Sequence, residues 1–291
     1  GHTRNSRPGI FVCRPAPLQV SYLGYPGTMG ADFIDYIIAD HTLIPKKNRR
    51  FYSEKIVYMP QCYQVSDNSR PVPEADVSRA ELGLPETGFV FCCFNHNYKI
   101  TPREFDIWMR LLTRVEGSVL WLRRSNKWSE INLKKEVKAR GVDPGRLVFA
   151  QKCAYSKYLA RMTKADLFLD TFNYNAGAIA NDALWCGLPV LTLQGQSYVA
   201  RMASSLLTAI DLPELITVTE DDYARLALDL AGNPEKLESI KARLNTTREN
   251  SLLFDTAQFT KDIETAYRRM YDRYFAGENP AHLFVDEQEP H

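Results

Sequence analysis

The segment from residue 89 to residue 122 decides the fold of this chain, because it contains a strand, a helix and a second strand in succession. The run Phe89–Phe94 (FVFCCF) is short and apolar, which predicts a buried strand. Thr101-Pro102-Arg103-Glu104 then predicts a helix start, with Thr101 as N-cap, Pro102 at the first helical position and Glu104 completing a capping box. The helix is expected to reach about Val115, and Ser118–Leu122 predicts the next strand.

The same alternation continues toward the C-terminus. Strands are expected at 146–150, 167–170, 189–193 and 215–218, and helices at 131–140, 156–163, 178–186 and 198–210, followed by helices at about 221–231, 234–249 and 256–275. Strands that alternate with helices pair in parallel, with helices on both faces of the sheet. Residues 88–250 therefore predict a doubly wound α/β domain, whose ligands bind beyond the carboxyl ends of the strands at the topological switch point.

The flanking parts of the chain have a different organisation. Residues 1–60 contain two expected strands, 19–24 and 34–39, with no full helix between them, so they predict the end of a sheet that begins upstream. The chain starts at Gly1 and not at Met, which indicates truncation. Residues 61–87 are polar and rich in proline, as in a linker. The expected division is thus 1–60, a linker at 61–87, a Rossmann-like lobe with C-terminal helices at 88–275 and a polar tail at 276–291.

The composition is that of a globular protein, with 45% hydrophobic and 24% charged residues among 291. The net charge of +1 lacks the basic excess of a nucleic-acid-binding protein. The one basic run, Lys46, Lys47, Arg49 and Arg50, is interpreted as a solvated loop in preference to a binding patch. No apolar stretch approaches the roughly 20 residues that span a bilayer. Neither a nucleic acid nor a membrane is an expected partner. The six cysteines show no CxxC or zinc spacing, which fits a reducing cytoplasm and no metal site.

Two loops at the carboxyl ends of predicted strands have candidate ligand-binding residues. In Asn95–Lys99, Lys99 could neutralise a diphosphate or be a solvated lysine of a surface turn, and position alone does not separate these readings. In Thr171–Gly177, small residues and the start of a helix form a possible diphosphate cradle, although neither a Walker loop nor GxGxxG is present. Asp182, one turn into that helix, could accept hydrogen bonds from a ribose or stabilise the helix end, and we favour the ribose.

Two further segments remain open between ligand binding and ordinary structure. Tyr155, Tyr158 and Arg161 could stack on a base, but packing is the commoner use of two tyrosines at this spacing. Arg201 follows a Gly-containing loop and could instead face solvent. No Asp-X-Asp follows a strand, so no metal bridging a sugar diphosphate is expected.

The sequence resembles the catalytic region of the bacterial type of the O-linked N-acetylglucosamine transferase family, also called the SPINDLY-like or GT41 group. The resembling segments are 1–3 with Arg7, 14–20, 23–28, 34–36, 52–55, 59–60, 94–95, 98–99, 118–122, 170–171 and 182–185 with Gly187.

This resemblance implies a GT-B architecture of two Rossmann-like lobes, of which the chain holds one complete lobe and the end of the other. It implies transfer of N-acetylglucosamine from UDP-N-acetylglucosamine to Ser or Thr hydroxyls of proteins, with inversion and without metal or cofactor. Lys99 would stabilise the leaving diphosphate as the catalytic residue. The implied donor-binding residues are Asn95, His96, Tyr98, Tyr158, Arg161, Gly177, Ala178, Ile179 and Asp182, and Leu23, Gly24 and Thr28 would line the sugar and acceptor side. An upstream catalytic lobe and tetratricopeptide repeats are expected in the full-length protein.

The sequence departs from the family at the helix start, where the family usually has His-Thr-Thr and this chain has Gly177, Ala178 and Ile179. Losing a hydrogen bond to a charged group costs about 1.5–3 kcal/mol. Two alternatives follow. The chain could use another nucleotide sugar, or it could be a non-catalytic nucleotide-sugar-binding or scaffold protein.

Overall fold

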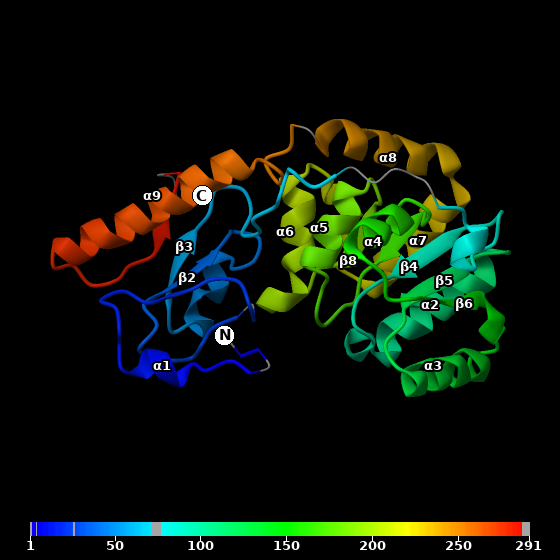
Figure 1. Ribbon diagram of the computed structural model, residues 1–291, viewed down its shortest axis with the longest axis horizontal. Helices are drawn as coiled ribbons and strands as arrows, with labels where there is room; N and C mark the ends of the chain where they lie inside the picture. The colour runs from blue at the N-terminus through cyan, green and yellow to red at the C-terminus, as the bar shows by residue number, and fades with distance from the viewer. Residues whose placement is uncertain (1, 4, 26, 72–76, 249, 287–291) are drawn as a thin grey trace.

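The computed structural model describes residues 2–3, 5–25, 27–71, 77–248 and 250–286, which form two lobes around two parallel sheets (Figure 1). The first sheet has the order β1 (Val20–Ser21), β2 (Tyr36–Ala39), β3 (Lys55–Tyr58) and β10 (Leu283–Phe284). The second has the order β6 (Leu147–Ala150), β5 (Val119–Arg123), β4 (Val90–Cys93), β7 (Leu167–Leu169), β8 (Val190–Leu193) and β9 (Ile216–Thr217). A single helical turn, α1 (Gly9–Val12), precedes β1.

The second sheet changes direction between β4 and β7. The chain builds outward from β4 through β5 to β6, returns to β7 beside β4, and builds outward the other way. Because parallel crossovers are right-handed, α2 (Pro102–Arg114) and α3 (Lys127–Ala139) lie on the face opposite α4 (Tyr155–Met162), α5 (Ala178–Trp185) and α6 (Met202–Ala209). Contacts of α4 with α5, α5 with α6, and α2 with α7 (Glu220–Gly232) agree with this layering. The doubly wound arrangement predicted for this part of the chain is confirmed, and its switch point lies between β4 and β7.

Local sequence sets the helix starts. The expected capping box is present at α2, where the Thr101 backbone N–H donates to Glu104 Oε1 at 2.7 Å. The predicted start of α3 at residue 131 was wrong, because Asn126 caps the helix by accepting from the Ser129 backbone N–H at 2.9 Å. The residues 127–130 therefore join the helix as a polar first turn.

The C-terminal part of the chain returns to the first lobe, which the sequence did not predict. α8 (Pro234–Arg248) covers the second lobe, but α9 (Thr256–Phe275) packs Ala266 and Met270 against Tyr36 and Val57 of the first sheet (Figure 1). Strand β10 pairs with β3 inside the expected polar tail. The assignment of 256–275 to the second lobe, and of residues 283 and 284 to a tail, is therefore wrong. The boundaries near 60 and 87 stay predictions, and 72–76 and 287–291 lie outside the described residues.

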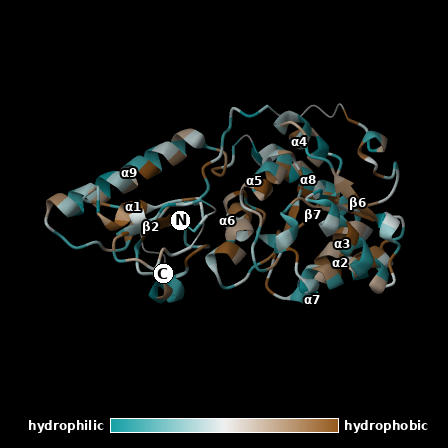
Figure 2. Cartoon of the chain, turned by 60° about the horizontal axis from the view of Figure 1, so that its bottom comes forward, coloured by the Kyte–Doolittle hydropathy of each residue, from teal (hydrophilic) through white to brown (hydrophobic). Residues whose placement is uncertain are grey.

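The core follows the apolar pattern of the sequence. One buried cluster includes all of β4 and its neighbouring strands, with Cys92 and Cys93 fully buried as expected. Figure 2 shows hydrophilic residues along the loops and outer helical surfaces, and hydrophobic residues on the elements between them. The basic run lies on a 3₁₀ helix (Lys46–Phe51), where Arg49 is not simply solvated, because its guanidinium lies 5.0 Å from the ring centroid of Tyr58. Within the described residues, no helix is long and apolar enough to cross a membrane.

Candidate functional site

The switch point is held together by a buried carboxylate at the end of β7. Asp170 Oδ1 accepts hydrogen bonds from the backbone N–H groups of Thr171 (2.9 Å) and Ala176 (2.8 Å) and from Asn95 Nδ2 (3.0 Å). Its Oδ2 accepts from Thr192 Oγ1 at 2.8 Å. Burial raises the pKa of Asp170 to about 7, against the opposing effect of these hydrogen bonds. One side chain thus fixes the loops after both β4 and β7.

Asn95, predicted to bind the donor, lies beneath this edge of the sheet. Its side chain is fully buried, and its amide nitrogen donates to Asp170 and to Thr171 Oγ1 at 2.8 Å. The structure therefore gives Asn95 a contact within the protein that orients the loop. Its neighbour Tyr98 lies at the opposite extreme, 75% exposed.

Lys99 extends from the loop after β4 to the loop after β7. Its Nζ donates to the backbone oxygen of Asn175 at 3.0 Å and lies 3.6 Å from the ring centroid of Tyr174. Burial lowers the pKa of Lys99, and the nearby Asp170 opposes this shift. An ammonium has three N–H donors, so Lys99 keeps donors for a further anion beside the start of α5.

A cavity of about 540 Å³ opens at the carboxyl ends of β4, β5 and β6. It brings together five of the predicted donor-binding residues, His96, Tyr158, Arg161, Ile179 and Asp182. The other lining residues are Phe94, Arg123, Arg124, Ser125, Ala150, Gln151, Lys152, Cys153 and Tyr155. A cavity of this size, with aromatic walls and a few convergent polar groups, has the character of a small-molecule site.

One wall of the cavity is an aromatic and cationic stack on α4. The guanidinium of Arg161 lies 4.9 Å from the ring centroid of Tyr158, which in turn stacks on Tyr155 at 5.9 Å. Arg161 Nη1 donates to the backbone oxygen of Gln151 at 2.7 Å. Burial lowers the pKa of Arg161, which still remains a cation because guanidinium titrates far above neutrality. Tyr158 and Arg161 thus pack on each other and face the cavity.

The lining also contains two residues that are hydrogen-bonded to each other, one of which the sequence did not single out. Arg123 Nη1 lies 2.7 Å from His96 Nε2. Arginine only donates, so Nε2 must accept and the imidazole is neutral, with its proton on Nδ1. Burial, followed by the charges of Arg123 and Lys99, lowers the pKa of His96. Arg123 could have been found from sequence, because it follows the strand predicted at 118–122 and so lies at the ligand edge.

Asp182 also lines the cavity, and two side chains donate hydrogen bonds to it. Its Oδ1 accepts from Tyr155 Oη at 2.8 Å and from Arg70 Nη1 at 2.7 Å. Burial raises the pKa of Asp182, and Tyr155 and Arg70 oppose that shift. No sequence signal indicated Arg70, because it lies in the interlobe linker, 112 residues before its partner.

The start of α5 was expected to offer an open surface for a diphosphate, but part of it is buried. Gly177 is buried, Ala178 is exposed and Ile179 is half-buried. A Cβ on Gly177 would lie 2.2 Å from Met202 Cε and 3.2 Å from Tyr63 Oη. Met202 therefore occupies the space that a side chain at residue 177 would need.

The residues predicted for the sugar side lie on the loop after β1. Leu23 and Gly24 both have positive φ, 52° and 73°. Thr28 Oγ1 donates to Glu54 Oε2 at 2.6 Å, which holds the loop against the strand β3.

Arg201, left open by the sequence, bridges the lobes instead of facing solvent or a ligand. Its guanidinium donates to the backbone oxygens of Thr42 in the first lobe and Gly195 in the second. Beside it, the buried Asp40 accepts from the Tyr63 backbone N–H at 2.9 Å and from Ser205 Oγ. These contacts fix α6 against the first lobe.

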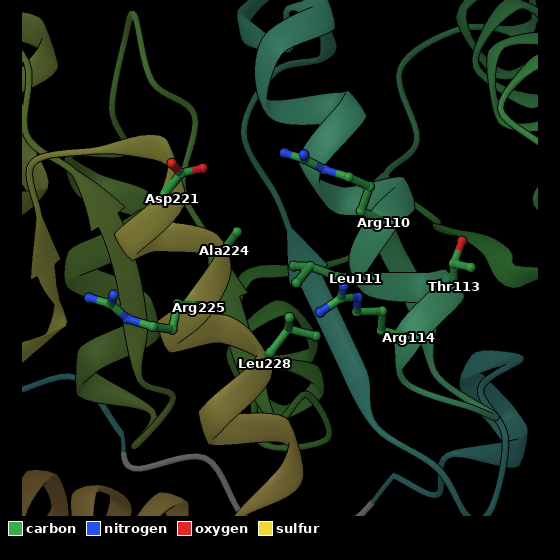
Figure 3. A pocket seen from close by; sticks show the side chains of 8 residues that line it. All are labelled: Arg110, Leu111, Thr113, Arg114, Asp221, Ala224, Arg225 and Leu228. Atoms are coloured by element: carbon green, nitrogen blue, oxygen red, sulfur yellow. The ribbon is translucent and has the colours of Figure 1, made fainter.

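A second hollow of about 560 Å³ lies between α2 and α7, away from every predicted site residue (Figure 3). Its floor is apolar, with Leu111 and Leu228, and Arg110 and Arg114 reach across it from α2. Arg225 points away from α2, so the three guanidinium groups do not converge. In the described ranges, no group of three or more His, Cys, Asp and Glu residues could hold a metal ion.

A doubly wound parallel sheet with a polar and aromatic cavity at the carboxyl ends of its strands defines an α/β protein with a ligand site in the place usual for this class. Comparison with known proteins narrows this class. Glycosyl transferase family 41 matches residues 1–77 and 72–263, and the chain belongs to that family. The resemblance found in the sequence is confirmed.

Three relatives illustrate the similarity. The "Probable UDP-N-acetylglucosamine--peptide N-acetylglucosaminyltransferase SEC" of Arabidopsis thaliana is 36% identical over 295 residues, covering 99% of this chain and 30% of that protein. A mutant of the O-GlcNAc transferase of Thermobaculum terrenum has a TM-score of 0.79 at 29% identity, covering 90% of this chain and 49% of that chain. The glycosyltransferase WaaG, at 14% identity and a TM-score of 0.56 over 88% of this chain and 80% of that one, shares the fold. The predicted GT-B-type fold is confirmed, and the chain spans about a third of the length of the curated relatives it matches.

Proposed function

We propose that this chain supplies the donor-binding half of a protein O-glycosyltransferase, which transfers N-acetylglucosamine from UDP-N-acetylglucosamine to Ser or Thr hydroxyls with inversion and without a metal. The observation that carries the proposal is the cavity that joins His96, Tyr158, Arg161 and Asp182, with Lys99 on the same loop as His96 although not among the lining residues. Family membership and the names of the relatives support the donor and the acceptor.

The chemistry follows from the charges around the cavity. As the sugar–phosphate bond breaks, negative charge develops on the leaving diphosphate, and Lys99 is a preorganised cation beside the start of α5. The neutral His96 and the guanidinium of Arg123 add donors on the β4–β5 side. Asp182 would accept from the ribose hydroxyls, and Tyr158 with Arg161 would hold the base. Cations of the protein would thus neutralise the charge that a metal ion neutralises in other transferases.

Calorimetric titration with UDP and UDP-N-acetylglucosamine tests the donor site. Lys99→Ala and Asp182→Ala should each weaken binding, whereas Lys135→Ala, which removes an exposed lysine of α3, should not. A folded chain that binds neither ligand, or whose affinity is indifferent to Lys99 and Asp182, would refute the assignment.

The replacement of His-Thr-Thr by Gly177-Ala178-Ile179 supports a second candidate, a family 41 transferase with another nucleotide sugar. Met202 fills the space beside Gly177 with an apolar group, so the pocket differs from one that contains hydroxyls. Tighter binding of another UDP-sugar than of UDP-N-acetylglucosamine would favour this candidate. Binding of UDP without transfer to peptide or water, in a protein that contains the upstream lobe, would favour a non-catalytic nucleotide-sugar-binding protein.

A further inference from the structure

Arg70 of the interlobe linker is bound to the second lobe through both terminal nitrogens of its guanidinium. Its Nη1 donates to Asp182 Oδ1 at 2.7 Å and its Nη2 donates to Asn181 Oδ1 at 2.9 Å. The guanidinium lies 4.8 Å from the ring centroid of Trp185 and 5.8 Å from that of Phe254. Only 8% of the Arg70 side chain is exposed. Such a clamped cation has lost the freedom of a surface arginine, so its geometry is well defined.

The linker around Arg70 is fixed as well. Arg70 Nε donates to the backbone oxygen of Asp67 at 2.7 Å, and Asn181 Nδ2 donates to Ser66 Oγ at 2.6 Å. Thr256, the first residue of α9, donates from Oγ1 to the backbone oxygen of Ser66 at 2.6 Å. The segment 66–70 is therefore bonded both to α5, which contains Asp182, and to the helix that returns to the first lobe.

We propose that Arg70 is a positioning residue, which holds the Asp182 carboxylate ionised and correctly oriented for the two ribose hydroxyls of the donor. The inference rests on the proposed donor site and names a linker residue as part of its machinery. Arg70 acts through Asp182 and does not touch the nucleotide. Arg70 Nη1 and Tyr155 Oη both donate to Asp182 Oδ1, which fixes that oxygen from two directions. Because Nη2 of the same guanidinium is held by Asn181 Oδ1, the donor to Asp182 is itself fixed in place.

Electrostatics supports this role. Burial raises the pKa of Asp182, and Arg70 opposes the shift. Without Arg70, the desolvated carboxyl would bind a proton at higher pH, and a protonated carboxyl is a weaker acceptor for hydroxyl groups. The phenols of Tyr155 and Tyr158 also lower the pKa of Asp182 through hydrogen bonds, but they do not supply a positive charge.

The test compares two nucleotides on three proteins. UDP and 2′,3′-dideoxy-UDP, which lacks both ribose hydroxyls, are titrated into the wild type, Arg70→Met and Arg70→Lys. Met retains an apolar chain between Trp185 and Phe254, and Lys retains charge without the fork. We expect Arg70→Met to weaken UDP about tenfold while 2′,3′-dideoxy-UDP changes less than about twofold, with Arg70→Lys between them. The loss of UDP affinity should grow as pH falls, because protonation of Asp182 sets in earlier.

The matched control is Arg79→Met, which breaks another ion pair between the linker and the second lobe, Arg79 Nη2 to Asp166 Oδ2 at 2.9 Å, away from the cavity. It should leave both affinities unchanged. Unaltered or tighter UDP binding by a folded Arg70→Met protein would overturn the inference, as would an equal loss for both nucleotides. Failure of the wild type to bind UDP would instead refute the donor site itself.

Discussion

The fit of Met202 against Gly177 gives a prediction whose magnitude follows from the structure. In Gly177→Ala, the new Cβ would lie 2.2 Å from Met202 Cε, far inside van der Waals contact, so one of the two groups must move. Overpacking of this kind costs about 1–3 kcal/mol. The obstructing atom is the flexible end of a methionine, so we expect the lower half of that range.

A double-mutant cycle with Met202→Ala isolates the contact. Met202→Ala removes a side chain that is only 8% exposed, and truncations of this kind cost about 2–5 kcal/mol. The double variant should be less destabilised than the sum of the single variants by about 1 kcal/mol or more, because the clash is gone. Urea unfolding of the four proteins gives the coupling energy.

The control for this cycle is Gly232→Ala in α7, where an added Cβ meets nothing within 4 Å and the helical backbone accepts alanine. That variant should be neutral or more stable by about 0.4–1 kcal/mol. Additivity of Gly177→Ala and Met202→Ala within about 0.5 kcal/mol would refute the reasoning. If coupling is found, restoring His-Thr-Thr at 177–179 should improve UDP-N-acetylglucosamine binding only when Met202 is also truncated.

Three further predictions concern single contacts in the loops that follow β7, β4 and β1. Burial raises the pKa of Asp170 from 3.8 to about 7, so the folded state holds this proton more tightly than the unfolded chain. The contribution of Asp170 to the free energy of unfolding is complete below pH 3.8 and declines as pH rises to about 7. Urea unfolding across this pH window should show that Asp170→Asn abolishes the decline. If the free energy of unfolding of the variant and of the wild type changed equally with pH, the raised pKa would be contradicted. Arg123→Leu should raise the pKa of His96, read from the imidazole proton resonances, and an unchanged pKa would exclude the electrostatic contact. Glu54→Gln should destabilise the fold by about 1–2 kcal/mol by weakening the bond from Thr28, with faster amide exchange in that loop, and protection at wild-type level would show that the contact is dispensable.

The local pattern of the sequence was sufficient to predict most of the second lobe. The alternation of apolar runs with capped helices located its strands within one residue at each end, since burial on both faces produces continuous apolar segments. The first sheet was harder to predict. β3 and β10 were not predicted, because both lie outside the strand–helix alternation that located strands of the same length in the second lobe. β3 follows a 3₁₀ helix, and β10 follows α9 in a segment of polar character.

The sequence likewise predicted some features of the candidate site and not others. His96, Lys99 and Asp182 were found because each follows a predicted strand or begins the next helix, and chain position fixes the edge of a parallel sheet. Asn95 shares that position, yet its amide is turned inward to Asp170. The direction of a side chain at the edge of the sheet depends on the neighbouring strand, and local sequence does not determine the order of the strands.

The sequence by itself determined the α/β class, the family and the sheet edge that contains the cavity, because these depend on periodicity and on motifs contiguous in the chain. Only the tertiary structure decided that Arg70 of the linker is the partner of Asp182, that Met202 fills the space beside Gly177, and that α9 and β10 complete the first lobe. Each of these contacts joins residues at least 25 positions apart, and the packing of buried groups selects them, since every buried charge needs a partner and every buried space must be filled.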